Sequence, residues 1–155
     1  LPLLFSQYEL LTRELLRRRR NGNPFDFFHF NIDLDGGPCL QKRLTGCGAG
    51  HEYMAVAPNG DIYPCHQFVG REKFLLGNVY NQKINGALVS HFRTAHVYSK
   101  EACAGCWARF YCSGGCHANA EMSNGTILEP YSPGCELAKK RLECAIYLKA
   151  MEAGA

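Results

Sequence analysis

Apolar residues recur with a helical period over the first twenty positions of the chain. The repeating positions, separated by intervals of four, three and four residues, are Leu4, Tyr8, Leu11 and Leu15. Because about 3.6 residues make one turn, this spacing predicts an amphipathic helix over residues 1–20. Ser6 and Glu9 have the separation of a capping box, and Asn21-Gly22-Asn23-Pro24 ends the helix, since glycine and proline resist continuation.

A second pattern, with a period of two, covers residues 25–34. Its apolar side contains Phe28, Phe30, Ile32 and Leu34, and its other side contains Phe27, His29, Asn31 and Asp33. Alternation with this many aromatic residues predicts a half-buried strand. A helix followed by such a strand is typical of the last unit of an α/β domain, so residues 1–36 are predicted to be the tail of a preceding domain.

Two short apolar runs, residues 52–57 and 61–65, flank Pro58-Asn59-Gly60. An Asn-Gly turn between such runs predicts a β-hairpin. A hairpin returns the chain to its starting point, so Cys47 before the first strand is expected to lie near Cys65 at the end of the second.

Three further elements complete the predicted fold. Residues 74–80 have the pattern of a short strand and turn, residues 85–96 that of a modest helix, and residues 135–151 that of a long final helix. Together with the hairpin they predict an α+β fold, with a small hairpin-containing domain over residues 37–155 and helices at both ends of the chain.

The chain contains nine cysteines, four of which fall within fourteen residues, at Cys103, Cys106, Cys112 and Cys116. An odd number, without the basic and apolar pattern of an export signal, favours thiols in a reducing cytoplasm over a secreted disulfide framework. The net charge of +3 is too small to indicate nucleic-acid binding. No apolar run of roughly 18 residues predicts a membrane span.

Helical geometry separates two of the thiols. Cys135 and Cys144 are nine residues apart, which on a helix places them about 13 Å apart along the axis and on opposite faces. The two therefore cannot bind one metal centre. Cys144 shares its face with Leu137 and Leu148 and is predicted to be a core thiol. The remaining eight cysteines are candidate metal ligands: Cys39, Cys47, Cys65, Cys103, Cys106, Cys112, Cys116 and Cys135.

Eight thiolates make two sets of four, and four thiolates suit either zinc or an iron–sulfur cluster. Structural zinc sites usually combine two Cys-x2-Cys knuckles, whereas only Cys103 and Cys106 have that spacing here. The wider intervals around Cys112 and Cys116, with glycines and aromatic residues between, favour the larger [4Fe–4S] cluster. Zinc, which a fragment made in air can also take up, stays the alternative.

The order and spacing of seven cysteines resemble a known signature. Cys47-x12-Gly60-x4-Cys65 is followed by Cys103-x2-Cys106-x5-Cys112-x3-Cys116 and then by Cys135. This resembles, over residues 39–150, the SPASM domain, the C-terminal auxiliary-cluster domain of radical S-adenosylmethionine (radical SAM) peptide maturases. Residues 60–70 and 135–144 resemble the subgroup that installs thioether crosslinks in short Cys-rich (SCIFF-type) peptides.

The resemblance implies two [4Fe–4S] clusters. The first would be held by Cys47, Cys65 and Cys116, and the second by Cys103, Cys106, Cys112 and Cys135. Cys39 lies outside the signature. It either completes the first set or leaves an open iron that a substrate thiolate can occupy.

The catalytic Cys-x3-Cys-x2-Cys triplet of radical SAM enzymes does not occur in this chain, because Asn119 stands where a third cysteine would follow Cys112 and Cys116. The resemblance therefore implies no catalytic residue here. S-adenosylmethionine would bind in a radical SAM core of the same parent chain, with residues 1–36 as its tail. Residue 1 is Leu rather than Met, which also suggests a piece of a longer protein. The implied partners are that core and a precursor peptide, with no nucleic acid or membrane.

Three functional hypotheses arise from these observations. The first is an electron-relaying and substrate-binding domain of an enzyme that forms thioether crosslinks in a ribosomally made peptide. The second is a related enzyme that oxidises a Cys or Ser of a sulfatase to formylglycine, with Asp61 or Glu52 as the base. The third is a zinc-stabilised binding module without a redox role, in which Trp107, Phe110 and Tyr111 form a docking patch or cover the site.

Overall fold

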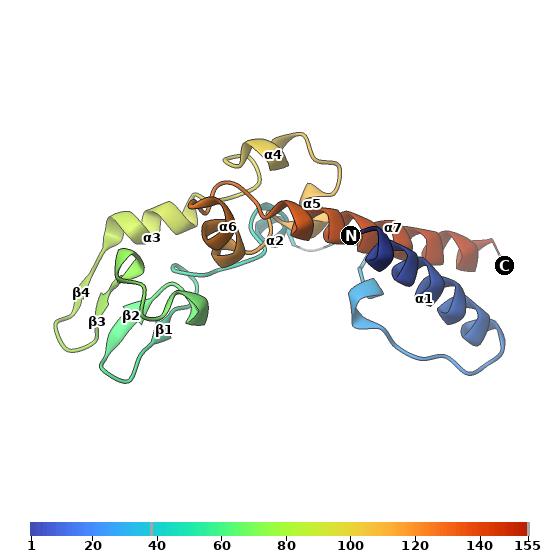
Figure 1. Ribbon diagram of the computed structural model, residues 1–155, viewed down its shortest axis with the longest axis horizontal. Helices are drawn as coiled ribbons and strands as arrows, with labels where there is room; N and C mark the ends of the chain where they lie inside the picture. The colour runs from blue at the N-terminus through green and yellow to red at the C-terminus, as the bar shows by residue number, and fades with distance from the viewer. Residues whose placement is uncertain (38, 155) are drawn as a thin grey trace. The chain divides into compact units, whose positions relative to one another are not determined.

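The computed structural model describes residues 1–37 and 39–154, and Figure 1 shows the course of the chain. The chain divides into two compact units. The terminal unit combines Leu1–Cys39 with Ser132–Ala155, and the central unit comprises Leu40–Tyr131. Each unit has its own core and is described separately below.

The terminal unit is built from two long helices, α1 (Pro2–Arg20) and α7 (Ser132–Ala153), which pack against each other (Figure 1). The residues of their shared core, each at most 7% exposed, are Leu15, Leu16, Phe30, Cys144 and Leu148. The predicted helices at both ends of the chain are confirmed, and so is the prediction that Cys144 is a core thiol.

The capping box predicted for the first helix is wrong. Helix α1 begins at Pro2, with Leu1 as its N-cap residue, and the Ser6 hydroxyl donates to the Leu3 carbonyl at 2.9 Å within the helix. Proline is favoured in the first helical turn because its fixed φ suits the helix and its missing N–H would have no partner there. The helix therefore starts before Ser6 and does not need its side chain.

The strand predicted over residues 25–34 is also wrong. The chain turns through a short 3₁₀ helix, η1 (Phe28–Phe30), in which the Phe30 N–H donates to the Phe27 carbonyl at 2.9 Å. This turn packs the rings of Phe27 and Phe30 4.8 Å apart and leaves Phe28 72% exposed. A strand needs a neighbour to pair its backbone, and the described residues of the terminal unit form no strand. The aromatic residues are buried by a turn instead.

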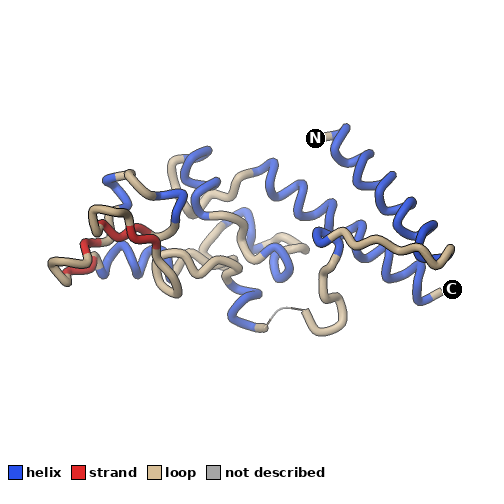
Figure 2. Tube along the Cα trace, turned by 90° about the horizontal axis from the view of Figure 1, so that it is seen from below, coloured by secondary structure: helices blue, strands red, loops and turns tan. Residues whose placement is uncertain are grey.

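The central unit contains a four-stranded antiparallel sheet in the order β1-β2-β3-β4 (Figure 2). The first pair is the predicted hairpin, in which Ala55 faces Tyr63 and Val56 faces Ile62. Gly60 closes its turn at φ +86°, a conformation that glycine adopts without strain. The strands are β1 (Ala55–Val56), β2 (Asp61–Tyr63), β3 (Gly77–Asn78) and β4 (Lys83–Ile84).

Helices of one or two turns make up much of the rest of the central unit. Helix α3 (Gly86–Arg93) is the one predicted from the sequence, and the Asn85 side chain caps it by accepting the Leu88 N–H at 3.0 Å. The others are α2 (Leu40–Leu44), η2 (His66–Phe68), η3 (Glu72–Phe74), α4 (Glu101–Ala104), α5 (Arg109–Cys112) and α6 (His117–Asn124). The α+β class is confirmed. None of the helices in the described parts of the chain is long and apolar enough to cross a membrane.

Three phenylalanine rings form the centre of the core of the central unit. Phe68 lies 4.4 Å from Phe74 and 5.4 Å from Phe92, measured between ring centroids, and each ring is at most 2% exposed. Cys65 belongs to the same core and is 5% exposed. The end of the hairpin is therefore anchored in this aromatic core.

Glu121 is a buried carboxylate, 5% exposed, that lies 3.0 Å from Lys73 Nζ and 3.6 Å from Arg71 Nη2. We expect Glu121→Ala to lower the free energy of unfolding by about 1–3 kcal/mol, because the charge-assisted hydrogen bonds of Glu121 are lost. Hydration of the exposed Lys73 ammonium offsets part of this loss. Urea denaturation of the metal-free chain measures the change. Glu14→Ala, which removes an exposed partner of Arg17, is the control and should cause no measurable loss. Equal stability of the two variants would contradict this assignment.

Candidate metal centre

Three thiols of the central unit converge at the end of the β1–β2 hairpin. Cys65, directly after Pro64, is buried in the core, and the half-buried Cys47 and Cys116 pack against the same core cluster. The Gly50 N–H donates to the Pro64 carbonyl at 2.9 Å and so ties the segment after Cys47 to the end of the hairpin. Residues far apart in the sequence are thus gathered into one group, as the hairpin predicted for Cys47 and Cys65.

Hydrogen-bond donors surround these sulfurs. The Tyr53 hydroxyl lies 3.5 Å from Cys47 Sγ, and Gln67 Nε2 donates to Cys116 Sγ at 3.6 Å. Burial raises the pKa of the Cys65 thiol, while the backbone N–H groups of Gln67 and Phe68 oppose that rise. The hydrogen bond with Cys47 raises the pKa of Tyr53, so the phenol keeps its proton and remains a donor. Such donors stabilise negative charge on sulfur.

Cys112 ends helix α5, and the backbone after it has an unusual conformation. Ser113, Gly114 and Gly115 all have positive φ, at +59°, +87° and +70°. Burial raises the pKa of Cys112, and hydrogen bonds from the Gly114 and Gly115 N–H groups lower it. Successive backbone N–H groups aimed at one point form an anion-binding concavity of the kind found at iron–sulfur sites. This part of the chain is therefore shaped to hold a thiolate.

The other two cysteines of the dense motif lie on and just after helix α4. Cys103 is 7% exposed, and Cys106 is half-buried and donates its N–H to the Cys103 carbonyl at 3.0 Å. Cys106 and Cys112 are close enough for the charge of Cys106 to raise the pKa of Cys112. Six of the eight predicted ligands therefore lie in the central unit: Cys47, Cys65, Cys103, Cys106, Cys112 and Cys116.

The remaining candidates lie in the terminal unit. Cys135 is half-buried near the start of α7, and Cys39 is exposed. The second predicted set, Cys103, Cys106, Cys112 and Cys135, is thus divided between the two units. The ligand roles of Cys39 and Cys135 stay predictions.

None of the described cysteines forms a disulfide. No three His, Cys, Asp or Glu side chains in the described chain are drawn together tightly enough to hold one metal ion. A zinc ion needs its thiolates about 2.3 Å from a single point. A cubane keeps its ligand sulfurs farther apart, because iron and sulfide atoms lie between them.

Residues 47–107 match SPASM, an iron–sulfur cluster-binding domain.

Similar proteins are known from an archaeon and from mycobacteria. The chain is 35% identical over 116 residues to an uncharacterized protein of Archaeoglobus fulgidus, covering 73% of this chain and 26% of the relative. It is 32% identical over 116 residues to mycofactocin maturase MftC of Mycolicibacterium smegmatis, covering 70% of this chain and 28% of the relative. It is 35% identical over 98 residues to mycofactocin maturase MftC of Mycobacterium tuberculosis, covering 59% and 24%.

The chain spans about a quarter of the length of these relatives. The SPASM match contains four of the proposed ligands: Cys47, Cys65, Cys103 and Cys106. The predicted similarity to a SPASM domain is confirmed. The thioether-forming subgroup stays a prediction.

The two carboxylates considered as bases beside this SPASM region are both engaged elsewhere. Asp61 accepts hydrogen bonds from Asn59 Nδ2 at 2.6 Å and Asn78 Nδ2 at 2.9 Å and so holds the hairpin turn. Glu52 lies 2.7 Å from Lys42 Nζ, and this contact lowers the pKa of Glu52. The lowered pKa of Glu52 is the opposite of what a general base near neutral pH requires.

The aromatic residues of the dense cysteine motif do not all cover the SPASM thiols. Trp107 is 52% exposed and Tyr111 39% exposed. Phe110 is half-buried, with the Arg109 guanidinium 4.5 Å from its ring centroid. The covering role predicted for all three is therefore wrong for Trp107 and Tyr111. The turn at Cys106 and the single helical turn of α5 direct these two rings to the surface.

Lys100 is a residue beside the SPASM thiols that the sequence did not indicate. Its side chain is only 1% exposed, and its Nζ donates to the Gly114 carbonyl at 2.7 Å and lies 3.4 Å from His117 Nδ1. Burial lowers the pKa of Lys100. The burial of His117 itself, together with the nearby charge of Lys100, lowers the pKa of His117 to about 4. Lysine is rarely buried without a specific partner, so no sequence pattern would have selected it.

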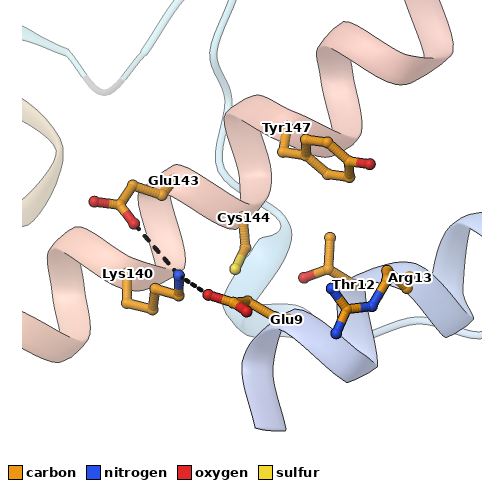
Figure 3. Close-up of a pocket in the computed structure, with 7 residues that line it drawn as sticks. All are labelled: Glu9, Thr12, Arg13, Lys140, Glu143, Cys144 and Tyr147. Atoms are coloured by element: carbon orange, nitrogen blue, oxygen red, sulfur yellow. Dashed lines mark hydrogen bonds and ion pairs between the residues drawn. The ribbon is translucent and has the colours of Figure 1, made fainter. Parts of the chain in front are cut away.

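A separate pocket of about 290 Å³ lies between α1 and α7 in the terminal unit (Figure 3). Lys140 Nζ stands between two carboxylates there, 2.5 Å from Glu9 Oε1 and 3.6 Å from Glu143 Oε2. Cys144 is the one thiol among the lining residues, so this pocket does not offer a thiolate cluster site. The lining residues are Glu9, Thr12, Arg13, Lys140, Glu143, Cys144 and Tyr147.

Proposed function

We propose that this chain is the auxiliary-cluster part of a radical SAM enzyme that matures a ribosomally made peptide. The observation that carries the proposal is the convergence of three thiols: Cys47 and Cys65, which lie in the region that matches an iron–sulfur cluster-binding domain, and Cys116, which follows that region. The similarity to mycofactocin maturases supports the peptide-maturation part. The thiols, which form no disulfides, suit a reducing cytoplasm.

The chain would hold two [4Fe–4S] clusters. Cys47, Cys65 and Cys116 would bind the first, with Cys39 as its candidate fourth ligand. The second would be bound by Cys103, Cys106, Cys112 and Cys135. Support comes from the N–H donors at Cys65 and Cys112, which stabilise thiolates that burial alone would protonate.

When bound, such clusters supply one-electron transfer and, where an iron is open, a place for a substrate thiolate. The residues of this chain would position and polarise them. Gln67 donates to the sulfur of Cys116, and the Tyr53 hydroxyl would donate to a thiolate at Cys47, 3.5 Å away. The core phenylalanines keep water away from Cys65. S-adenosylmethionine would bind in the radical SAM core of the same parent chain, with residues 1–36 as the tail of that core and residues 37–155 as the SPASM domain.

Two reactions are candidates for the parent enzyme. The first is the formation of a thioether crosslink in a Cys-rich precursor peptide, which residues 60–70 and 135–144 suggest. The second is a maturation of the mycofactocin type, which the similarity to mycofactocin maturases favours. In the first reaction a substrate thiol is consumed, whereas in the second the modified residue need not be a cysteine.

Anaerobic reconstitution of the chain tests the cluster proposal. We expect about eight irons and about eight sulfides per chain, with the Mössbauer parameters of [4Fe–4S] clusters. A chain that binds two zinc ions and no sulfide would overturn the proposal and leave the zinc-stabilised binding module.

Mass spectrometry of a precursor peptide treated with the parent enzyme and S-adenosylmethionine separates the two reactions. A thioether product lacks two hydrogens and has one thiol fewer that an alkylating reagent can modify. A product in which every cysteine is still alkylated contradicts the thioether reaction and supports the alternative.

A further inference from the structure

Lys100 is among the largest fully buried side chains of the described chain, together with Phe68 and Phe92. It directly precedes helix α4, and its carbonyl accepts the N–H groups of Cys103 at 2.9 Å and Ala104 at 3.1 Å. Its backbone is therefore fixed at the start of the dense cysteine motif, while its side chain runs into the interior.

The hydrogen-bond partners of the Lys100 ammonium are neutral. They are the carbonyl of Gly114 at 2.7 Å and the imidazole of His117 at 3.4 Å. The ion pairs of the described residues include no carboxylate partner for Lys100. A buried ammonium is strongly destabilising unless negative charge lies nearby. Anions close to this position would therefore stabilise the ammonium form of Lys100.

Cysteine thiolates would supply those anions. The Lys100 ammonium binds the carbonyl of Gly114, which lies between Cys112 and Cys116, and the Lys100 carbonyl accepts the N–H of Cys103. In agreement with this placement, burial lowers the pKa of Lys100, and the charges of Cys103, Cys112, Cys47 and Cys116 oppose that change. The close packing of Gly114 fixes the arrangement, since a Cβ there would lie 3.3 Å from Lys100 Nζ. The ammonium is thus held by the loop that connects Cys112, of the second proposed set, to Cys116, of the first.

We propose that Lys100 is the buried counter-cation shared by both thiolate groups, and that it raises the reduction potential of the cluster bound at each. This inference rests on the proposed function. A cubane with thiolate ligands carries net negative charge, which grows when an electron is added. A fixed positive charge in a low-dielectric interior stabilises the reduced form more than the oxidised form. Reduction by an external one-electron donor such as dithionite adds the electron to the cluster, and the negative charge so gained favours the protonated form of Lys100.

The test is an anaerobic redox titration of the reconstituted chain, followed by electron paramagnetic resonance, for the wild type and for Lys100→Met. We expect unchanged iron content and at least a tenfold lower ratio of reduced to oxidised cluster at a given potential, for both clusters. Tenfold corresponds to about 59 mV for a one-electron couple. Lys73→Met is the matched control, because Lys73 is 68% exposed and pairs with Glu121, and it should leave both potentials unchanged.

Each outcome decides a separate point. Unchanged potentials in a fully loaded Lys100→Met chain would overturn the role of Lys100, and so would a shift of only one cluster. If the Lys100→Met chain does not bind iron, the Lys100→Arg chain is tested next. Iron binding with wild-type reduction potentials in Lys100→Arg would support the need for a cation at this position. Failure of Lys100→Arg to bind iron would show that Lys100 has a packing role instead. A wild-type chain without iron or sulfide would overturn the proposed function itself.

Discussion

Replacing Cys65 with alanine should halve the iron content of the reconstituted chain, from about eight irons to about four. Cys65 is the most buried thiol of the first proposed set, 5% exposed, and receives N–H groups from Gln67 and Phe68. Without it, the first set keeps only two thiols in the central unit, Cys47 and Cys116, which cannot retain a cubane. The second cluster should persist, because its proposed ligands do not include Cys65. Iron and sulfide analysis with Mössbauer spectroscopy measures the result.

Two further variants make this prediction specific. Cys112→Ala should likewise remove about four irons, and the double variant Cys65→Ala/Cys112→Ala should bind almost none. Cys144→Ala is the matched control, since Cys144 is equally buried, 4% exposed, but lies in the core of the terminal unit. It should retain full iron. Loss of iron in the control, or full iron in Cys65→Ala, would contradict the proposed ligand sets.

Truncating Phe92 should destabilise the central unit more than any other single change considered for its core. Phe92 is 0% exposed, and its ring centroid lies 5.4 Å from that of Phe68 and 5.6 Å from that of His117. Phe92→Ala removes these contacts and leaves a cavity, which costs about 3–5 kcal/mol. The melting temperature of the metal-free chain should fall by about 10 °C, measured by circular dichroism.

The control for this experiment is the same substitution at an exposed ring. Phe28 is 72% exposed, so Phe28→Ala should change the melting temperature little. Phe92 also packs against Gly50, in the segment that follows Cys47, since a Cβ on Gly50 would be 3.0 Å from the Phe92 ring. Phe92→Ala should therefore also weaken cluster loading. A variant as stable as Phe28→Ala would show that the aromatic core does not anchor the site.

Local signals in the sequence were sufficient for several elements. The helical period of residues 1–20, the Asn-Gly turn before Gly60 and the nine-residue separation of Cys135 and Cys144 each depend on short-range geometry. The structure confirms the helices, the hairpin and the core position of Cys144. The cysteine spacing indicated the SPASM similarity for the same reason, because ligand loops are defined by intervals along the chain.

Some predictions from the sequence pattern failed because they depended on a packing partner that the pattern does not contain. Alternation over residues 25–34 predicts a strand only if another strand pairs with it, and a 3₁₀ turn at Phe28–Phe30 buries the rings instead. Trp107 was expected beside the metal, but the turn that precedes it leaves it exposed. Pattern alone cannot supply the partner that each of these residues meets.

The sequence by itself determined the type of chemistry: clustered thiols, their intervals, and a hairpin that brings Cys47 and Cys65 together. Only the tertiary structure decided what surrounds the sulfurs, namely the donors Tyr53 and Gln67 and the buried ammonium of Lys100. The physical reason is that ligand spacing is a property of the backbone between neighbouring residues. The charge and polarity around a sulfur instead depend on side chains brought from distant positions by packing.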